Sequence, residues 1–191
     1  MDHKLSISGN SFRLRPVSLE DAAFVVEVRT DPLRNRFINP TSSDVEKQEQ
    51  WLKRYFEAPD DYYFIIENES TGEREGTVGI YGLDADAKRA EWGRWVVRRG
   101  SKSAIPSLLL SFKLAFERIG LDSLYTHTAA ENRSALMALE RFGMEEKRRL
   151  PGYLHIGGRA YDAIEHEMTR EKWSRIFRPG RDSARHATSG A

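Results

Sequence analysis

Residues 90–104 read AEWGRWVVRRGSKSA, and this stretch says more about the fold than any other part of the chain. Its first half alternates in polarity and ends in Val96 and Val97, which predicts a strand over 89–97. A loop of small and basic residues follows, and a helical pattern begins at once, with Pro106 in its first turn. Such a helix start presents unpaired backbone N–H groups and the positive end of the helix dipole. The stretch therefore predicts a phosphate or pyrophosphate site, with Ser103 as the N-cap residue of the helix.

The loop matches neither of two common phosphate-binding motifs. A P-loop needs G-x-x-x-x-G-K-[ST], but Ser101 separates Gly100 from Lys102, and Val97 stands where the first glycine belongs. A Rossmann loop needs G-x-G-x-x-G, of which Gly100 alone is present. An ordinary strand-to-helix turn with solvated charges is the alternative interpretation, and the loop by itself does not decide between the two.

Outward from this stretch, hydrophobic periodicity and turn residues predict alternating strands and helices. Ser18 and Asp21 are spaced as a capping box at a helix start, and Gly120 is placed to end the long helix. We expect strands at 12–17, 62–67, 76–83, 89–97, 124–128, 146–150 and 161–168, and helices at 18–29, after 44, from 104 to 119, at 132–143 and at 171–177. This order predicts an α+β domain built on a mostly antiparallel sheet.

Composition and charge narrow the class of protein. The 191 residues include 30 basic and 29 acidic side chains, a balance that gives no general attraction to nucleic acid or to anionic membranes. There is no cysteine, and the five histidines never have ligand spacing, so we expect no disulfide and no metal site. No apolar run approaches the roughly 20 residues of a membrane span, and no signal peptide is visible, so a cytoplasmic location is expected.

We find no repeat or linker between residues 12 and 176 and expect a single domain over residues 1–178. Residues 179–191 contain almost no apolar side chains, and we expect a disordered tail there. The sequence leaves the oligomeric state open.

Three segments resemble one known family. Residues 14–21, LRPVSLED, resemble its opening strand and helix; residues 90–97, AEWGRWVV, its fourth strand; and residues 131–144, ENRSALMALERFGM, a later helix. With the order of elements, this resemblance to the GNAT superfamily of N-acetyltransferases covers about residues 12–170. It implies a GNAT fold, with a mixed, mostly antiparallel sheet of about seven strands flanked by helices. It also implies acetyl-CoA as the acetyl donor, with no metal.

The resemblance further implies where the cofactor binds. The family's fourth and fifth strands splay apart, and the pantetheine arm lies in the gap. That arm would pair with the backbone of Val96 and Val97, and Asn132 would face it from the other side. The pyrophosphate would bind at the loop formed by Arg99, Gly100, Ser101, Lys102, Ser103 and Ala104.

The chain departs from the family pattern at two places. Lys102 stands where the pyrophosphate loop usually has its first glycine. Leu139 stands where many members carry the tyrosine that acts as general acid. A serine that some relatives use instead falls at Ala135, although Ser134 is adjacent, so the general acid remains open.

Glu91 matches the carboxylate with which some relatives deprotonate the acceptor amine, directly or through water. The alternative is a charged strand residue that pairs with Arg89 or Arg94. Strand alternation would place Glu91 with Gly93 and Trp95 on one face, and Trp92, Arg94 and Val96 on the other, with open space at Gly93. We expect the aromatic residues Tyr81, Trp92 and Trp95, as well as His127, to belong to the core.

The resulting hypothesis is an enzyme that transfers an acetyl group from acetyl-CoA to a primary amine by direct attack. We favour an amino sugar or nucleotide-linked amino sugar as the small-molecule acceptor. The alternatives are a protein N-terminal amine, and a non-catalytic acyl-CoA-binding module.

Overall fold

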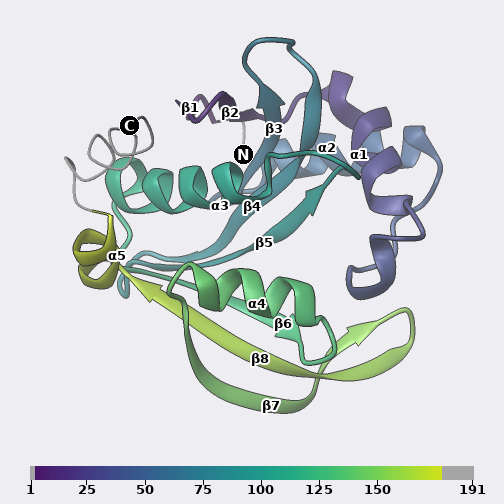
Figure 1. Cartoon of the computed structure of the whole chain (residues 1–191). Coiled ribbons are helices and arrows are strands. Elements are labelled where there is room, and N and C mark those ends of the chain that lie inside the picture. The colour runs from purple at the N-terminus through teal and green to yellow at the C-terminus, as the bar shows by residue number, and fades with distance from the viewer. Residues whose placement is uncertain (1–2, 178–191) are drawn as a thin grey trace, which may run out of the picture.

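The computed structural model describes residues 3–177, and its strands form one eight-stranded sheet in the order β1-β2-β3-β4-β5-β6-β8-β7 (Figure 1). Within the described residues, β5 and β6 pair in parallel and the other neighbours are antiparallel. The strands are β1 (Ile7–Gly9), β2 (Phe12–Pro16), β3 (Tyr62–Asn68), β4 (Arg74–Asp84), β5 (Arg89–Val97), β6 (Ser123–Ala129), β7 (Glu145–Ile156) and β8 (Arg159–Thr169). The expected α+β class with a mostly antiparallel sheet is confirmed.

Helices cover both faces of the sheet (Figure 1). They are α1 (Ala22–Thr30), α2 (Val45–Glu57), α3 (Ala104–Lys113), α4 (Arg133–Arg141) and α5 (Arg170–Ile176), and a π-helical segment, Leu114–Ile119, continues α3 up to Gly120. One core cluster buries Phe112 of α3, Leu139 of α4 and Trp173 of α5 against the sheet. A second cluster buries side chains of α1 and α2 against the opposite face, including Phe24 and Leu52. No helix among the described residues has the length and apolar character needed to cross a membrane.

The eighth strand, β1, was not expected from the sequence. It forms a hairpin with β2 in which Ile7 faces Leu14 and Gly9 faces Phe12. The two loop residues, Asn10 and Ser11, have φ values of 53° and 67°, the left-handed conformation that a two-residue turn matched to strand twist requires. The tail expected at residues 179–191 lies outside the described residues, and the single-domain boundary at 178 stays a prediction.

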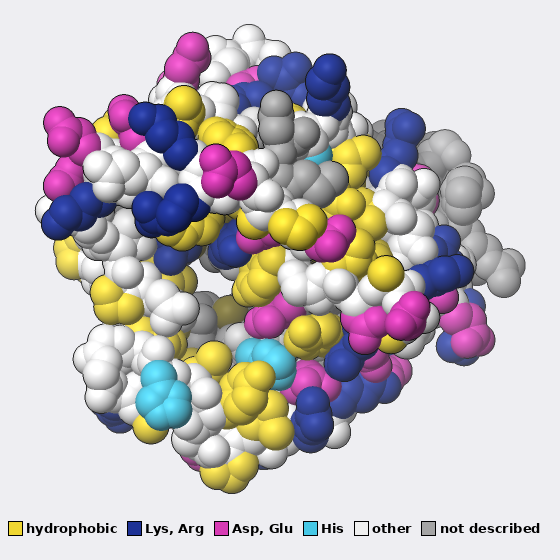
Figure 2. Space-filling view, turned by 180° about the vertical axis from the view of Figure 1, so that it is seen from behind, with side chains coloured by type: hydrophobic (Ala, Val, Ile, Leu, Met, Phe, Trp, Pro, Cys, Tyr) yellow, Lys and Arg dark blue, Asp and Glu magenta, His cyan; other side chains and the backbone are white. Residues whose placement is uncertain are grey.

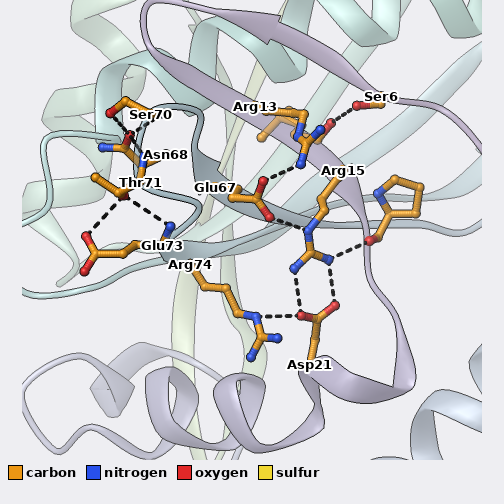
Figure 3. A network of polar contacts seen from close by, with 12 residues as sticks. Ser6, Arg13, Arg15, Asp21, Glu67, Asn68, Ser70, Thr71, Glu73 and Arg74 are labelled. Carbon is orange, nitrogen blue, oxygen red and sulfur yellow. Dashed lines mark hydrogen bonds and ion pairs between the residues drawn. The ribbon is translucent and has the colours of Figure 1, made fainter.

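A buried ion network fixes α1 to the sheet (Figure 3). Ser18 and Asp21 form the expected capping box, and the Ser18 N–H donates to the Asp21 carboxylate at 2.8 Å. The same carboxylate accepts two bonds from Arg15, at 2.8 and 2.9 Å, and lies 3.0 Å from Nε of Arg74. Arg15 also donates to Glu67 of β3. One cluster of charges therefore joins β2, β3 and β4 to the N-terminus of α1.

A bulge in β5 overturns the expected side-chain alternation beyond Gly93. Gly79 of β4 pairs with Gly93 and Thr77 with Val96, so two residues of β5 oppose one of β4. Arg94 takes a φ of 51°, and Thr77 Oγ1 donates to its carbonyl at 2.8 Å. As a result Trp95 lies on the α3 face beside Trp92, with ring centroids 5.2 Å apart, rather than beside Glu91.

The pairing of β5 with β6 is short, and this positions the site. The two strands pair through Arg89, Ala90 and Glu91, where Glu91 faces Tyr125. Beyond Glu91, β5 continues along β4 without a partner on its β6 side. The strands therefore separate at Glu91 and leave one edge of Val96 and Val97 unpaired.

Candidate active site

A groove of about 400 Å³ lies where β5 and β6 separate. Trp95, Val96, Val97 and Ala104 line one side, and Asn132 and Ser134 at the start of α4 line the other. The segment between α1 and α2 closes it with Phe37 and Ile38 among other residues. The structure thus places Val96, Val97 and Ala104 in the same groove as Asn132, which lies 28 or more residues further along the chain.

The loop from Arg98 to Ser103 joins β5 to α3 next to this groove. Ser103 occupies the expected N-cap position, but its side chain makes no capping bond and is fully buried. Its N–H donates to Ser101 Oγ at 3.0 Å, and Ser101 Oγ donates to Ser103 Oγ at 2.8 Å. These two serines therefore hold the loop together. Arg98, Arg99, Gly100 and Lys102 are its exposed members, and Gly100 has a φ of 78°.

The start of α4 is also as the sequence predicts. Asn132 is the N-cap residue, and its side-chain oxygen accepts from the Ala135 N–H at 3.4 Å and from Ser134 Oγ at 3.2 Å. Leu139, at the position of the family's tyrosine, is 1% exposed and belongs to the main core. No polar group stands at that position, and Ser134 is the hydroxyl on α4 that lines the groove.

Glu91 lies beside a half-buried histidine rather than beside an arginine. Nδ1 of His127 is 3.5 Å from Oε1 of Glu91, and Nε2 of His127 is 2.9 Å from Oε2 of Glu165. The imidazole thus joins a carboxylate on β5 to one on β8. The two candidate partners of Glu91 are engaged elsewhere, because Arg89 pairs with Glu165 and Arg94 pairs with Asp61.

The space beside Gly93 is filled by a tyrosine hydroxyl, so the expected opening there is absent. A Cβ added at Gly93 would lie 2.3 Å from the Tyr81 hydroxyl oxygen. Tyr81 faces Glu91 across the β4–β5 pair, and the Arg94 guanidinium lies 4.4 Å from its ring centroid. Tyr81 lines a cavity on the α1/α2 face rather than a core cluster, unlike Trp92, which is buried as expected.

Both neighbours of Glu91 have a raised pKa, which favours the cation at His127 and the neutral hydroxyl at Tyr81. A hydrogen bond to Glu91 raises the pKa of His127 above its usual 6.5, although burial opposes this, and Glu165 adds to the rise. Burial raises the pKa of Tyr81, and the nearby Glu91 carboxylate raises it further. At neutral pH, Tyr81 is therefore a neutral hydroxyl next to a carboxylate and an imidazole that readily carries a proton. Figure 2 shows a hollow on the side of the molecule turned away from the viewer in Figure 1, with apolar, basic, acidic and histidine side chains around it.

The raised pKa of His127 predicts how its contribution to stability changes with pH. The protonated ring, between two carboxylates, stabilises the fold below about pH 6.5, and this contribution is lost as the pH rises through the folded-state pKa. The difference in unfolding free energy between wild type and His127→Gln should therefore be larger at pH 6 than at pH 9. Urea denaturation at both values measures it, with the exposed His155→Gln as the control. An equal difference at both values would show that His127 is not held as a cation.

Sequence reasoning treated Tyr81 and His127 as core residues and did not single out Glu165. The three residues come from β4, β6 and β8, and their approach to Glu91 depends on sheet order and register.

Elsewhere, ligand atoms of Glu140, Glu146 and His166 lie within 4.8 Å of one another, although Arg149 donates to Glu146 at 2.9 Å. The expectation of no metal stays a prediction.

Several solved structures of similar fold are described as acetyltransferases. A mutant of the spermidine N-acetyltransferase SpeG from Vibrio cholerae has a TM-score of 0.75 and 19% identity, over 86% of this chain and 97% of that one. A GCN5-related N-acetyltransferase from Brucella melitensis has a TM-score of 0.78 and 20% identity, over 90% and 81%. Apo FdhC, a nucleotide-linked sugar GNAT, has a TM-score of 0.75 and 21% identity, over 91% and 94%. At these identities the likeness shows the fold alone.

Sequence comparison identifies the family. No curated protein matches the chain. Residues 11–145 match the family described as acetyltransferase (GNAT) domain, a span that runs from β2 to the start of β7 and contains Glu91, the loop before α3 and Asn132. Fold and family model agree, and the chain belongs to the GNAT acetyltransferase family.

Proposed function

We propose that this protein transfers an acetyl group from acetyl-CoA to a primary amine on a small molecule, with an amino sugar or nucleotide-linked amino sugar as the favoured acceptor. The observation that carries the proposal is the separation of β5 from β6 at Glu91. It leaves the backbone of Val96 and Val97 facing a groove, and Glu91, the last β5 residue that pairs with β6, supplies a carboxylate where the two strands separate. An extended amide-containing arm and an attacking amine need these two features.

The residues present fit acetyl-CoA along the groove. The unpaired edge of Val96 and Val97 supplies backbone donors and acceptors for the pantetheine amides, and Asn132 faces them from α4. Arg99, Gly100 and Lys102 lie at the positive end of α3, which suits the pyrophosphate. We assign no such contact to Ser103, because its N–H is already bonded to Ser101.

In this proposal the reaction is a direct attack. The amine nitrogen forms a bond to the thioester carbonyl carbon, the C–S bond breaks, and the sulfur leaves as a thiolate that takes up a proton. An ammonium has no lone pair, so the amine must first lose a proton, and Glu91 is placed to accept it. His127 acts as a positioning residue, because it holds Glu91 from one side while Glu165 fixes the ring from the other.

An acceptor screen tests the function. The purified chain is incubated with labelled acetyl-CoA and with amino sugars, nucleotide-linked amino sugars, spermidine and N-terminal peptides, and acetylated product is measured. We expect the highest kcat/KM with an amino sugar or its nucleotide-linked form. Preference for a peptide would favour the N-terminal amine instead. Tight acetyl-CoA binding without turnover on any amine would favour a non-catalytic acyl-CoA-binding module.

The loop before α3 yields a binding prediction. The double variant Arg99→Ala/Lys102→Ala removes two exposed cations next to the helix start, and each contact between a cation and a phosphate is worth about 0.5–1 kcal/mol at a surface. The Kd for coenzyme A, measured by calorimetry, should therefore rise about 5–30-fold. Lys113→Ala, at the far end of the same helix, is the control and should leave the Kd unchanged. Unchanged affinity in the double variant would place the pyrophosphate elsewhere.

A further inference from the structure

The cavity beside Tyr81 has a charge pattern that the proposed reaction does not explain. It measures about 490 Å³, lies on the α1/α2 face of the sheet, and is lined by Tyr81 and by four basic residues: Arg29, Lys47, Arg54 and Arg94. An adjoining cavity of about 430 Å³ shares Arg29, Pro40 and Thr41 with it and adds Arg36 and Arg159. Because Tyr81 faces Glu91 across the β4–β5 pair, the first cavity lies next to the proposed base.

Neither cavity has an aspartate or glutamate in its lining. The whole chain has 30 basic and 29 acidic side chains, so this separation of charge is local and does not follow from composition. A concave surface with one sign of charge concentrates ligands of the opposite sign. The pattern therefore points to an anion.

Most of these cations lack a carboxylate partner. Arg94 is neutralised by Asp61, with contacts of 2.6 and 2.8 Å. Arg29 donates to neutral oxygens, Thr41 Oγ1 at 2.8 Å and the Asn39 carbonyl at 3.2 Å. Arg36 and Arg159 lie over the rings of Phe37 and Tyr161, at 4.9 and 4.7 Å from the centroids.

The other two cations that line the first cavity are Lys47 and Arg54, which lie on one face of α2. Within residues 3–177, the charged side-chain nitrogens of Lys47, Arg54, Arg29, Arg36 and Arg159 have no carboxylate oxygen within 4.0 Å. All five line the joined cavities without a counter-ion, and all but Arg29 are exposed, so an anionic ligand that enters from solvent would pair with them. Phosphate oxygens match guanidinium groups in a bidentate geometry, and a diphosphate is long enough to meet more than one of them.

We propose that the acceptor carries a phosphate or diphosphate group, which binds between α1 and α2 at Arg29, Lys47 and Arg54 while its amine reaches Glu91. This rests on the proposed function and narrows it to phosphorylated or nucleotide-linked amines. The same cations disfavour a polyamine, because a second positive charge on the acceptor would meet them at close range. We therefore expect this protein to share the fold of the spermidine acetyltransferases but not to use spermidine as its acceptor.

Kinetics with matched acceptors tests the proposal. Lys47→Gln and Arg54→Gln should each raise the KM for a nucleotide-linked amino sugar about 2–5-fold, as expected for one lost contact between an exposed cation and a phosphate. The KM for the free amino sugar and for acetyl-CoA should stay unchanged. Lys53→Gln is the matched control, because Lys53 is an exposed neighbour on α2 that does not line the cavity. The KM for the nucleotide-linked acceptor should also rise with ionic strength.

Three results separate this proposal from the proposed function. If Lys47→Gln and Arg54→Gln affect the charged and the uncharged acceptor equally, or if spermidine is the best acceptor, the anion site is wrong while acetyl transfer stands. Calorimetry with inorganic pyrophosphate, in saturating coenzyme A to block the loop before α3, gives a second readout. Pyrophosphate binding that Lys47→Gln and Arg54→Gln weaken, without turnover on any amine, would support the anion site and overturn the proposed function.

Discussion

Replacing Glu91 with glutamine is expected to lower turnover about 10²–10⁴-fold, the usual worth of general-base assistance, while the affinity for acetyl-CoA stays close to that of the wild type. The amide keeps the size of the side chain and its place beside His127, but it does not accept a proton at neutral pH. In the variant, the rate should climb as the pH rises, because free amine then replaces ammonium without help. Steady-state kinetics with one amine over a range of pH measures both effects.

The control for this prediction is a carboxylate outside the site. Glu73 is exposed in the turn between β3 and β4, and Glu73→Gln should keep full turnover. Full turnover in Glu91→Gln at every pH would assign the proton to another group or to solvent. Glu91 would then be a strand residue whose role is to pair with His127.

Replacing Asp21 with asparagine is expected to destabilise the fold by about 3–5 kcal/mol, the typical cost of removing one partner from a buried ion pair. Asp21 is fully buried, and its carboxylate holds Arg15, Arg74 and the Ser18 N–H. An amide leaves the Arg74 guanidinium without its anion and leaves Arg15 with Glu67 alone. For a domain of this size the melting temperature should fall by about 6–20 °C, which calorimetry or circular dichroism measures.

A surface pair provides the comparison for Asp21. Glu171 and Arg175 lie 3.4 Å apart with side chains 82% and 66% exposed, and Glu171→Gln should change the melting temperature little. A melting temperature unchanged in Asp21→Asn would contradict the assignment of the network as a structural anchor.

The Asp21 network also makes a prediction about acid. Burial alone would raise the pKa of Asp21, but bonds from Arg15 and Ser18 outweigh it and hold the pKa below its usual value. The stabilisation is therefore present above about pH 4 and is lost as the pH falls through the folded-state pKa. The Asp21→Asn variant should lack this acid-dependent loss.

Local patterns in the sequence predicted most of the elements correctly. The Ser18–Asp21 capping box, the helix from Ala104, its end at Gly120 and the cap at Asn132 are as expected, because each depends on contacts within a few residues. The hairpin at Asn10 and Ser11 was missed, although its turn is also local. Its strand β1 has only three residues and no clear alternation.

The faces of β5 could not be derived from the sequence, because a bulge interrupts its regular period. Arg94 takes a left-handed conformation that is uncommon for a residue with a side chain. Thr77 donates to its carbonyl and Asp61 accepts from its guanidinium, and both of these residues belong to other parts of the chain. The bulge places the Trp95 side chain on the α3 face of the sheet and the Arg94 side chain on the α1/α2 face.

By itself, the sequence determined the fold class, the family resemblance and the position of Glu91 and of the loop before α3. These depend on short-range periodicity, capping and spacing, which a linear chain displays directly. Tertiary structure alone decided that His127 and Glu165 stand beside Glu91, that the Ser103 N–H is bonded to Ser101, and that the basic residues of α1 and α2 face one cavity. The reason is physical: the charged groups meet through sheet order and helix packing, and the path of the loop before α3 sets the serine contact, so none of these contacts appears as a periodic pattern in the sequence.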